Sequence, residues 1–216
     1  MQFHQAKSKI ISICRKLNQK NYIAAGDGNV SFKISDHEIL ITPSGINKSE
    51  MQPSEIAALT IHNESLAGHP SSERLMHIEV YKRCPMAKAV VHAHPPTAVA
   101  WTIAHPDLKE LPAECMSELI LSAGGIPIVP YARPGTNQMA EVLAPFLPNF
   151  RVMILARHGA ISWGETLDEA YNGIERIEHS AIILKAASEL GGLTFLNHEE
   201  VSILRQIRSR LGNKTL

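Results

Sequence analysis

The 216-residue sequence lacks several features that mark common classes of protein. It has no excess of charge, with 21 basic and 21 acidic side chains, which argues against general binding to nucleic acid or to an acidic membrane. No apolar run is long enough to span a bilayer, and the opening segment MQFHQAKSKI lacks the apolar centre of a signal peptide. We therefore expect a cytoplasmic protein with no membrane or nucleic-acid partner.

Cysteine is also scarce. Cys14, Cys84 and Cys115 are odd in number and form no C-x-x-C pair, which excludes a cysteine zinc cage and fits a reducing compartment. No basic Walker-type loop is present, so phosphoryl transfer is not indicated. The remaining composition, 44% hydrophobic and 19% charged without repeat or linker, predicts a single domain over residues 1–216.

Histidine, by contrast, is plentiful, with eleven copies. His92 and His94 follow the apolar run Ala89–Val91, which reads as a buried strand closed by two prolines. Side chains alternate along a strand, so both imidazoles project from the same face. Such a pair suits a divalent metal, although the motif by itself also fits polar residues where a strand meets a loop.

A third histidine, His158, ends another apolar strand-like run, and Gly159 beside it allows close backbone approach. Three histidines at strand ends are the pattern of a catalytic zinc site whose fourth position is open or taken by a carboxylate. Glu73, at the start of a predicted helix, is the natural carboxylate, and His77 is expected to support the site. Imidazole and oxygen ligands favour zinc, with manganese, cobalt or iron as substitutes.

Three loops offer hydrogen-bond donors suited to an anion, although each also fits ordinary turn chemistry. They lie at 26–29, at 42–45 and at a helix start where Ser71 or Ser72 is expected to be the N-cap. Together they would hold a phosphate away from a reacting hydroxy-ketone, so the expected substrate is a phosphorylated ketose or its triose fragment. The residues assigned to phosphate are Asn29, Ser44, Gly45, Ser71 and Ser72.

The periodicity of apolar residues predicts alternating helices and strands. A capping box at 166–169 begins the longest predicted helix. The predicted helices cover about 3–17, 71–83, 97–104, 137–147, 166–190 and 199–211, and the predicted strands cover about 30–34, 38–42, 57–61, 89–92, 126–129, 152–156 and 160–163.

Five short motifs occur in an order that resembles the class II aldolase/adducin family, and within it most closely the L-fuculose-phosphate aldolases. They are G-N-V-S at 28–31, T-P-S-G at 42–45, P-S-S-E at 70–73, V-V-H-A-H at 90–94 and H-G at 158–159. The resemblance runs from about Lys7 to Ala187. It implies an α/β fold, a three-layer α/β/α sandwich with a mainly antiparallel central sheet, assembled as a homotetramer with active sites at subunit interfaces.

The resemblance also implies roles for the motif residues. His92, His94 and His158 would bind Zn²⁺, and Glu73 would be a fourth, displaceable ligand and the acid/base. The five residues assigned to phosphate would hold the substrate phosphate. The implied reaction is zinc-dependent retro-aldol cleavage of a ketose 1-phosphate, such as L-fuculose 1-phosphate, to dihydroxyacetone phosphate and a short aldehyde such as lactaldehyde.

Two positions depart from the fuculose-phosphate aldolase pattern, and both belong to the wall around the aldehyde. Glu118 stands where those enzymes carry a tyrosine, and Pro134 stands where they carry a phenylalanine. Glu118 resembles the catalytic carboxylate of methylthioribulose-1-phosphate dehydratases, but it equally fits a helix start.

Other members of the family suggest alternative functions for the chain. A dehydratase is one, and a ribulose-phosphate 4-epimerase is another, although counterparts of the epimerase's additional acid/base residues are not evident. A non-catalytic adducin-like scaffold is disfavoured by the intact metal set and by the lack of a long basic tail.

Overall fold

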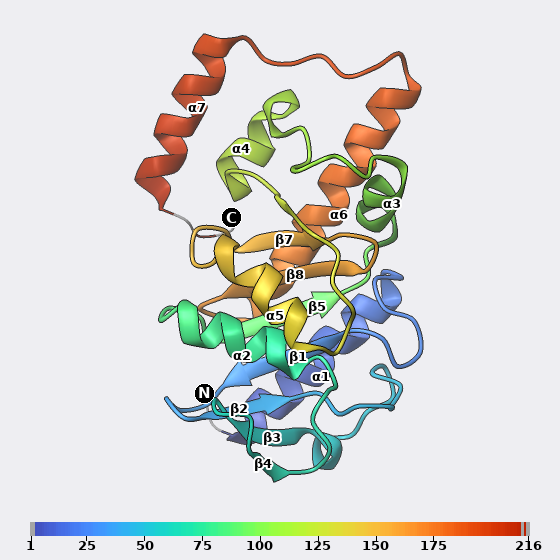
Figure 1. Ribbon diagram of the computed structural model, residues 1–216, viewed down its shortest axis with the longest axis vertical. Helices are drawn as coiled ribbons and strands as arrows, with labels where there is room; N and C mark the ends of the chain where they lie inside the picture. The colour runs from blue at the N-terminus through green and yellow to red at the C-terminus, as the bar shows by residue number, and fades with distance from the viewer. Residues whose placement is uncertain (1–2, 213, 215–216) are drawn as a thin grey trace.

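A computed structural model describes residues 3–212 and Lys214, and one eight-stranded sheet forms its centre (Figure 1). The strand order is β4-β3-β2-β1-β5-β8-β7-β6, and neighbouring strands are antiparallel except for the parallel pair β6–β7. The strands are β1 (Asn29–Lys33), β2 (Glu38–Ile41), β3 (Ala57–Thr60), β4 (Ser65–Ala67), β5 (Ala89–Ala93), β6 (Ile128–Val129), β7 (Val152–Leu155) and β8 (Gly159–Gly164).

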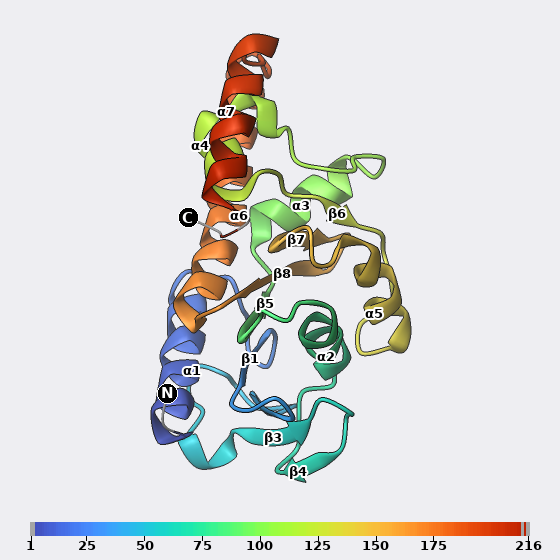
Figure 2. The same cartoon turned by 90° about the vertical axis from the view of Figure 1, so that its left-hand side faces the viewer.

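Helices cover both faces of this sheet, as Figures 1 and 2 show. On one face lie α1 (Phe3–Gln19) and α6 (Leu167–Glu189), and on the other lie α2 (Arg74–Arg83) and α5 (Asn137–Leu143). Alternation along β1 explains the two layers, because Val30 and Phe32 pack in the core with α1 and α6 while Ser31 contacts α2. The expected three-layer α/β/α sandwich with a mainly antiparallel sheet is confirmed.

The remaining helices, α3 (Pro96–Ala104), α4 (Ser117–Ala123) and α7 (His198–Leu211), gather toward the β7 side of the molecule. The start of α3 is fixed by the buried carboxylate of Glu178 on α6, which accepts hydrogen bonds from the backbone N–H groups of Thr97 at 3.0 Å and Ala98 at 2.9 Å. Short 3₁₀ turns occupy Pro53–Glu55, Ala113–Cys115 and Ala144–Phe146.

The structure differs from the predicted elements at several places. Helix α4 lies outside all of the predicted helices. Strand β4 was not predicted, because its three exposed residues show no apolar alternation. The strand expected at 126–129 is reduced to β6. The helix expected to reach 147 leaves α geometry after Leu143, two residues before Pro145, which has no N–H to donate.

A further difference is at the start of α2, where Glu73 occupies the N-cap instead of Ser71 or Ser72. The Ser71 hydroxyl accepts a hydrogen bond from the backbone N–H of Glu73 at 3.2 Å. Ser71 therefore accepts from the N-cap residue itself and not from the first turn of the helix. This hydrogen bond orients the backbone that carries the Glu73 carboxylate. Among the described residues, no helix combines the length and apolar character needed to cross a bilayer.

Candidate metal centre and substrate cavity

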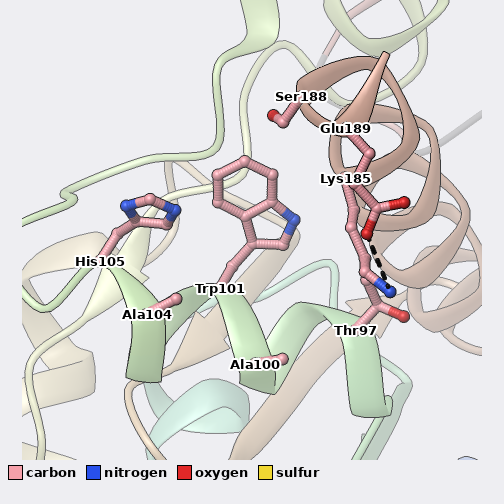
Figure 3. Close-up of a pocket in the computed structure, with 8 residues that line it drawn as sticks. All are labelled: Thr97, Ala100, Trp101, Ala104, His105, Lys185, Ser188 and Glu189. Carbon is pink, nitrogen blue, oxygen red and sulfur yellow. Dashed lines mark ion pairs between the residues drawn. The ribbon is translucent and has the colours of Figure 1, made fainter. Parts of the chain in front are cut away.

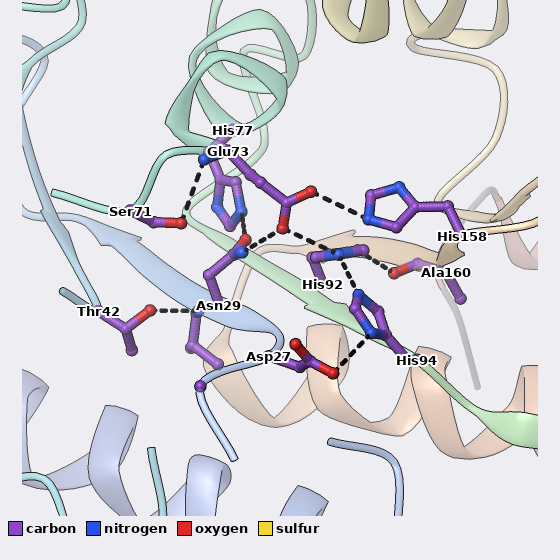
Figure 4. A network of polar contacts seen from close by, with 12 residues as sticks. Asp27, Asn29, Thr42, Ser71, Glu73, His77, His92, His94, His158 and Ala160 are labelled. Atoms are coloured by element: carbon purple, nitrogen blue, oxygen red, sulfur yellow. Dashed lines mark hydrogen bonds and ion pairs between the residues drawn. The ribbon is translucent and has the colours of Figure 1, made fainter. Parts of the chain in front are cut away.

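Four side chains from three segments converge at one end of β5 (Figure 4). His92 lies within β5, His94 directly follows it, His158 lies in the turn between β7 and β8, and Glu73 begins α2. One potential ligand atom from each lies within 4.8 Å of the others. We call these four residues the ligand cluster. The structure therefore brings together all four residues that the sequence assigned to a metal.

The turn that carries His158 is tightly constrained. Arg157 has a positive φ of 58°, and its backbone N–H donates a 2.8 Å hydrogen bond to the Thr102 hydroxyl on α3. A side chain at Gly159 would collide with the Ala93 carbonyl and with the His92 ring. Glycine at 159 is therefore what lets the β7–β8 turn approach β5 closely enough to place His158 in the ligand cluster.

The hydrogen bonds of two histidines fix which ring nitrogen faces the centre. The His92 Nδ1 lies 2.8 Å from the Ala160 carbonyl, which can only accept, so this nitrogen carries the proton. The His94 Nδ1 lies 3.4 Å from a carboxylate oxygen of Asp27, which favours the same tautomer. Both Nε2 atoms then present lone pairs, and they face each other at 3.0 Å. Two opposed lone pairs repel unless a cation lies between them.

Glu73 completes a donor set that fits a divalent cation. Its Oε2 lies 3.2 Å from the His92 Nε2, and its Oε1 lies 3.0 Å from the His158 Nε2 without forming a hydrogen bond. Ligand atoms around a tetrahedral zinc ion lie about 3.3 Å apart, given bonds of about 2.0–2.1 Å. Three imidazoles and one carboxylate at these separations match a zinc-type site.

The electrostatics of the ligand cluster also favour a cation. Burial, reinforced by the neighbouring His92 and His158, lowers the pKa of His94 to about 4, so its ring is neutral near pH 7. Burial opposes ionisation of Glu73, but its interactions with His92 and His158 outweigh that effect and hold its pKa below the ordinary value. A neutral imidazole and an ionised carboxylate are the protonation states that metal coordination requires.

A cavity of about 520 Å³ opens beside the ligand cluster, and the residues assigned to phosphate all line it. The Ser71 oxygen accepts from the Glu73 backbone, which leaves the Ser71 O–H available to a ligand. Asn29 uses one amide N–H to reach the Glu73 Oε2 at 2.9 Å and retains a second N–H. The full set is Asn29, Ser44, Gly45, Ser71 and Ser72.

Lys48 is a lining residue that sequence reasoning missed. Its side chain is buried, and its ammonium group donates to the carbonyls of Gly26 at 2.9 Å and Ile46 at 2.7 Å. Burial lowers the pKa of Lys48. An ammonium group has three N–H donors, so one remains for an anion in the cavity. In the sequence, Lys48 is only a lysine three residues after the 42–45 loop. It belongs to no periodic pattern that would predict its burial beside the cavity.

Pro134 and Glu118, the two positions that differ from the fuculose-phosphate aldolase pattern, lie in different surroundings. Pro134 lines the cavity, as expected for a wall residue. Glu118 lies in the first turn of α4, where it accepts a 3.0 Å hydrogen bond from Ser117, and it is not among the cavity-lining residues. A catalytic role for Glu118 stays a prediction, and it would require the residue to reach the cavity of a neighbouring subunit.

A second hollow, of about 290 Å³, lies between α3 and α6 (Figure 3). The Trp101 and His105 rings lie beside each other there with centroids 4.9 Å apart, and Lys185 pairs with Glu189 at 3.5 Å. None of the residues predicted to bind metal or phosphate lines this hollow. The residues predicted to bind phosphate all line the other cavity, at the ligand cluster.

Comparison with known proteins gives consistent matches. The profile of the Class II Aldolase and Adducin N-terminal domain matches residues 8–184, a segment that includes the whole ligand cluster. A 3-oxo-tetronate 4-phosphate decarboxylase of Escherichia coli is 31% identical over 184 residues, covering 82% of this chain and 85% of the relative. An L-fuculose phosphate aldolase of Methanococcus vannielii is 34% identical over 173 residues, covering 80% of this chain and 92% of the relative. The crystal structure of YgbL from Escherichia coli has a TM-score of 0.87 at 27% identity and covers 94% of this chain and 99% of that chain.

Proposed function

Because the chain belongs to the class II aldolase/adducin family, as its motifs predicted, we propose that it is a zinc-dependent aldolase of the lyase class. It would cleave a ketose 1-phosphate, such as L-fuculose 1-phosphate or a similar deoxyketose phosphate, to dihydroxyacetone phosphate and a short aldehyde. The observation that carries this proposal is the convergence of Glu73 and three histidines beside a cavity lined by hydroxyl, amide and ammonium donors.

His92, His94, His158 and Glu73 would hold one Zn²⁺ per subunit. When bound, the cation supplies a Lewis acid that draws electron density from the carbonyl and hydroxyl oxygens of a hydroxy-ketone. The tautomers fixed by Ala160 and Asp27 keep two of the imidazole nitrogens ready for this role.

The other end of the cavity would bind the phosphate. The hydroxyls of Ser44, Ser71 and Ser72 supply donors, and Lys48 adds a positive charge that compensates part of the phosphate charge. Binding energy gathered at the phosphate would position the reacting carbons against Glu73, which is how remote contacts accelerate a reaction.

Proton transfer follows from the direction of cleavage. A base takes the proton of the C4 hydroxyl, the C3–C4 bond breaks, and its electron pair passes into the enediolate of dihydroxyacetone phosphate. Glu73, having first taken up a proton from solvent, then delivers that proton to C3, as a carboxyl group next to the reacting carbon can. The base releases the C4 hydroxyl proton to solvent, so no net proton is gained or lost. We assign the first step to Glu118 of a neighbouring subunit.

Decarboxylation is a second candidate, which the motifs alone do not suggest. A 3-oxo-tetronate 4-phosphate that loses CO₂ leaves the same enediolate, so the phosphate contacts and the protonation by Glu73 would be unchanged. No hydroxyl proton has to be removed. The position of Glu118 outside the cavity of its own chain favours this candidate, together with the 31% identical decarboxylase relative.

A substrate panel tests both candidates. Zinc-loaded protein would be incubated with L-fuculose 1-phosphate, related deoxyketose 1-phosphates and 3-oxo-tetronate 4-phosphate, with dihydroxyacetone phosphate, aldehyde and CO₂ measured separately. Dihydroxyacetone phosphate with an aldehyde supports the aldolase, and dihydroxyacetone phosphate with CO₂ supports the decarboxylase. Loss of water, epimerisation, or no product from any substrate contradicts both.

We further propose a cytoplasmic homotetramer built from a single domain over 1–216. The three free cysteines fit a reducing compartment, and an assembly with sites at subunit interfaces would explain how Glu118 reaches a cavity. Light scattering on the purified protein should give the mass of four 23.7 kDa chains.

A further inference from the structure

A chain of hydrogen bonds runs from the ligand cluster to buried residues of the core. Figure 4 shows its first links, from Glu73 to Asn29 and from Asn29 to His77. The Asn29 amide nitrogen donates to the Glu73 Oε2 at 2.9 Å. The Asn29 Oδ1 is in close contact with the His77 Nε2. The His77 Nδ1 lies 2.7 Å from the Ser31 hydroxyl, which lies 2.7 Å from the Tyr81 hydroxyl. His77, Ser31 and Tyr81 are all buried.

The chemistry of these groups gives the chain one direction. A carbonyl oxygen only accepts, so the His77 Nε2 must donate to the Asn29 Oδ1. Burial, with a smaller contribution from His92, lowers the pKa of His77 to about 3, so its ring is neutral and its Nδ1 accepts from the Ser31 O–H. The Ser31 oxygen then accepts from the Tyr81 O–H. Each contact in the chain therefore has one fixed donor and one fixed acceptor.

This direction matters for Asn29, whose amide can otherwise rotate by half a turn. In the rotated state its Oδ1 would face the Glu73 carboxylate, and two acceptors would repel each other. The His77 Nε2–H binds the amide oxygen of Asn29 and so keeps that oxygen turned toward His77. The amide nitrogen is then left facing the Glu73 carboxylate. His77 is not among the residues that line the cavity, and its two ring nitrogens contact Asn29 and Ser31.

We propose that His77 is a positioning residue, whose ring, oriented by Ser31 and Tyr81, sets the Asn29 amide and through it the Glu73 carboxylate. The catalytic part of this inference rests on the proposed function, because it takes Glu73 as the group that transfers the proton. The metal-binding part rests only on the contacts described above.

Two substitutions at His77 separate positioning from packing. In His77→Gln, the side-chain amide nitrogen can take the place of Nε2 and still donate to Asn29. In His77→Asn, the shorter side chain reaches only the region of Nδ1, so the donor toward Asn29 is lost. Ser31→Ala removes the hydroxyl that donates to the His77 Nδ1. Without that donor, nothing keeps the ring proton of His77 on Nε2, where it faces Asn29. Val80→Ala, also buried on α2, is a control for loss of packing.

The first readout is zinc affinity, measured by competition with a chelator, and it does not depend on activity. His77→Asn and Ser31→Ala should weaken zinc binding by about 10-fold or more, as loss of partners behind metal ligands does, while His77→Gln stays within about threefold of the parent. Val80→Ala should lower Tm and leave zinc affinity unchanged. In the assay for dihydroxyacetone phosphate, His77→Asn should lower kcat more than it raises KM.

Equal zinc affinity in His77→Asn and His77→Gln would overturn the proposal. It would also be overturned if zinc affinity followed Tm across all four variants, since that outcome assigns His77 a purely structural role. If the parent protein forms no dihydroxyacetone phosphate from any substrate, the proposed function fails, and the zinc affinities still decide the role of His77.

Discussion

Gly159 and His94 approach each other so closely that a Cβ atom on the glycine would lie 2.7 Å from the His94 Cδ2. The same atom would lie 2.9 Å from the His92 Cε1. Gly159→Ala should therefore separate the β7–β8 turn from β5. We expect zinc affinity to fall by about 10-fold or more, with a stability cost of about 1–3 kcal/mol from overpacking. Chelator competition and chemical denaturation measure the two effects.

The matched control is Gly26→Ala, because a Cβ there would come no nearer than 3.7 Å to the Ile46 carbonyl. It should leave zinc affinity at the parent value. Parent-like zinc binding in Gly159→Ala would show that the close approach at 159 does not determine the ligand cluster.

Glu73→Gln should retain zinc and lose most turnover, because it removes proton transfer more than it removes a ligand. The expected loss in kcat is about 10²- to 10⁴-fold, the usual contribution of a positioned acid/base. Metal content by mass spectrometry and the rate of dihydroxyacetone phosphate formation give the comparison. His158→Ala is the complementary variant, and it should lose the metal itself. Near-normal turnover in zinc-replete Glu73→Gln would exclude Glu73 as the acid/base.

Lys48→Met should weaken binding of the phosphate end of the substrate. Loss of one charged hydrogen bond costs about 1.5–3 kcal/mol, so KM should rise about 10- to 100-fold with a smaller change in kcat. Competitive inhibition by inorganic phosphate should weaken in parallel. Lys82→Met, at an exposed position on α2, is the control and should change neither value. Unchanged phosphate inhibition in Lys48→Met would remove Lys48 from the phosphate site.

Stability should fall as the pH decreases from about 6.5, in part because of His77. The pKa of His77 is about 3 in the folded protein and about 6.5 when unfolded. Between these values the unfolded chain binds a proton that the native protein does not bind. The difference amounts to about 2 kcal/mol at pH 5, using about 1.4 kcal/mol per pH unit. Above about pH 7 the contribution is complete and constant.

Urea denaturation of metal-free protein at pH 7 and pH 5 measures this effect. His77→Gln should show a smaller loss of stability between the two pH values than the parent, whereas the exposed His62→Gln should show the parent's loss. An unchanged pH dependence in His77→Gln would mean that His77 does not titrate in this way.

Subunit mixing tests the proposed action of Glu118 across an interface. Glu73→Gln and Glu118→Gln should each be nearly inactive alone. After co-refolding in equal amounts, about a quarter of the interface sites should contain both native carboxylates, so activity should return to about that fraction. No recovery would place both residues in one subunit's site or remove Glu118 from catalysis. Full activity of Glu118→Gln alone would identify it as a helix-start residue.

The sequence predicted the ligand cluster well because strand alternation fixes where His92 and His94 point, whatever the rest of the chain does. The apolar patterns of the long helices and the inner strands predicted those elements, whereas the three-layer arrangement was implied by the resemblance to the family. It could not give Lys48, because a buried lysine in an irregular loop leaves no periodic signal. The links of His77 to Asn29 and Ser31 span 48 and 46 residues, and only tertiary packing creates them.

The position of β5 in the sheet determines when the ligand cluster can exist. His92 pairs with Asn29 on one side and with Ile161 on the other, residues 63 and 69 positions away in the chain. Such distant pairings form slowly, because the entropy cost of closing a long loop comes before the favourable energy of the contacts. His158, in the turn before β8, can therefore join His92 and His94 only once β8 has docked against β5. Uptake of zinc by refolding protein would thus report this docking, and a chain stalled before it would leave the ion in solution.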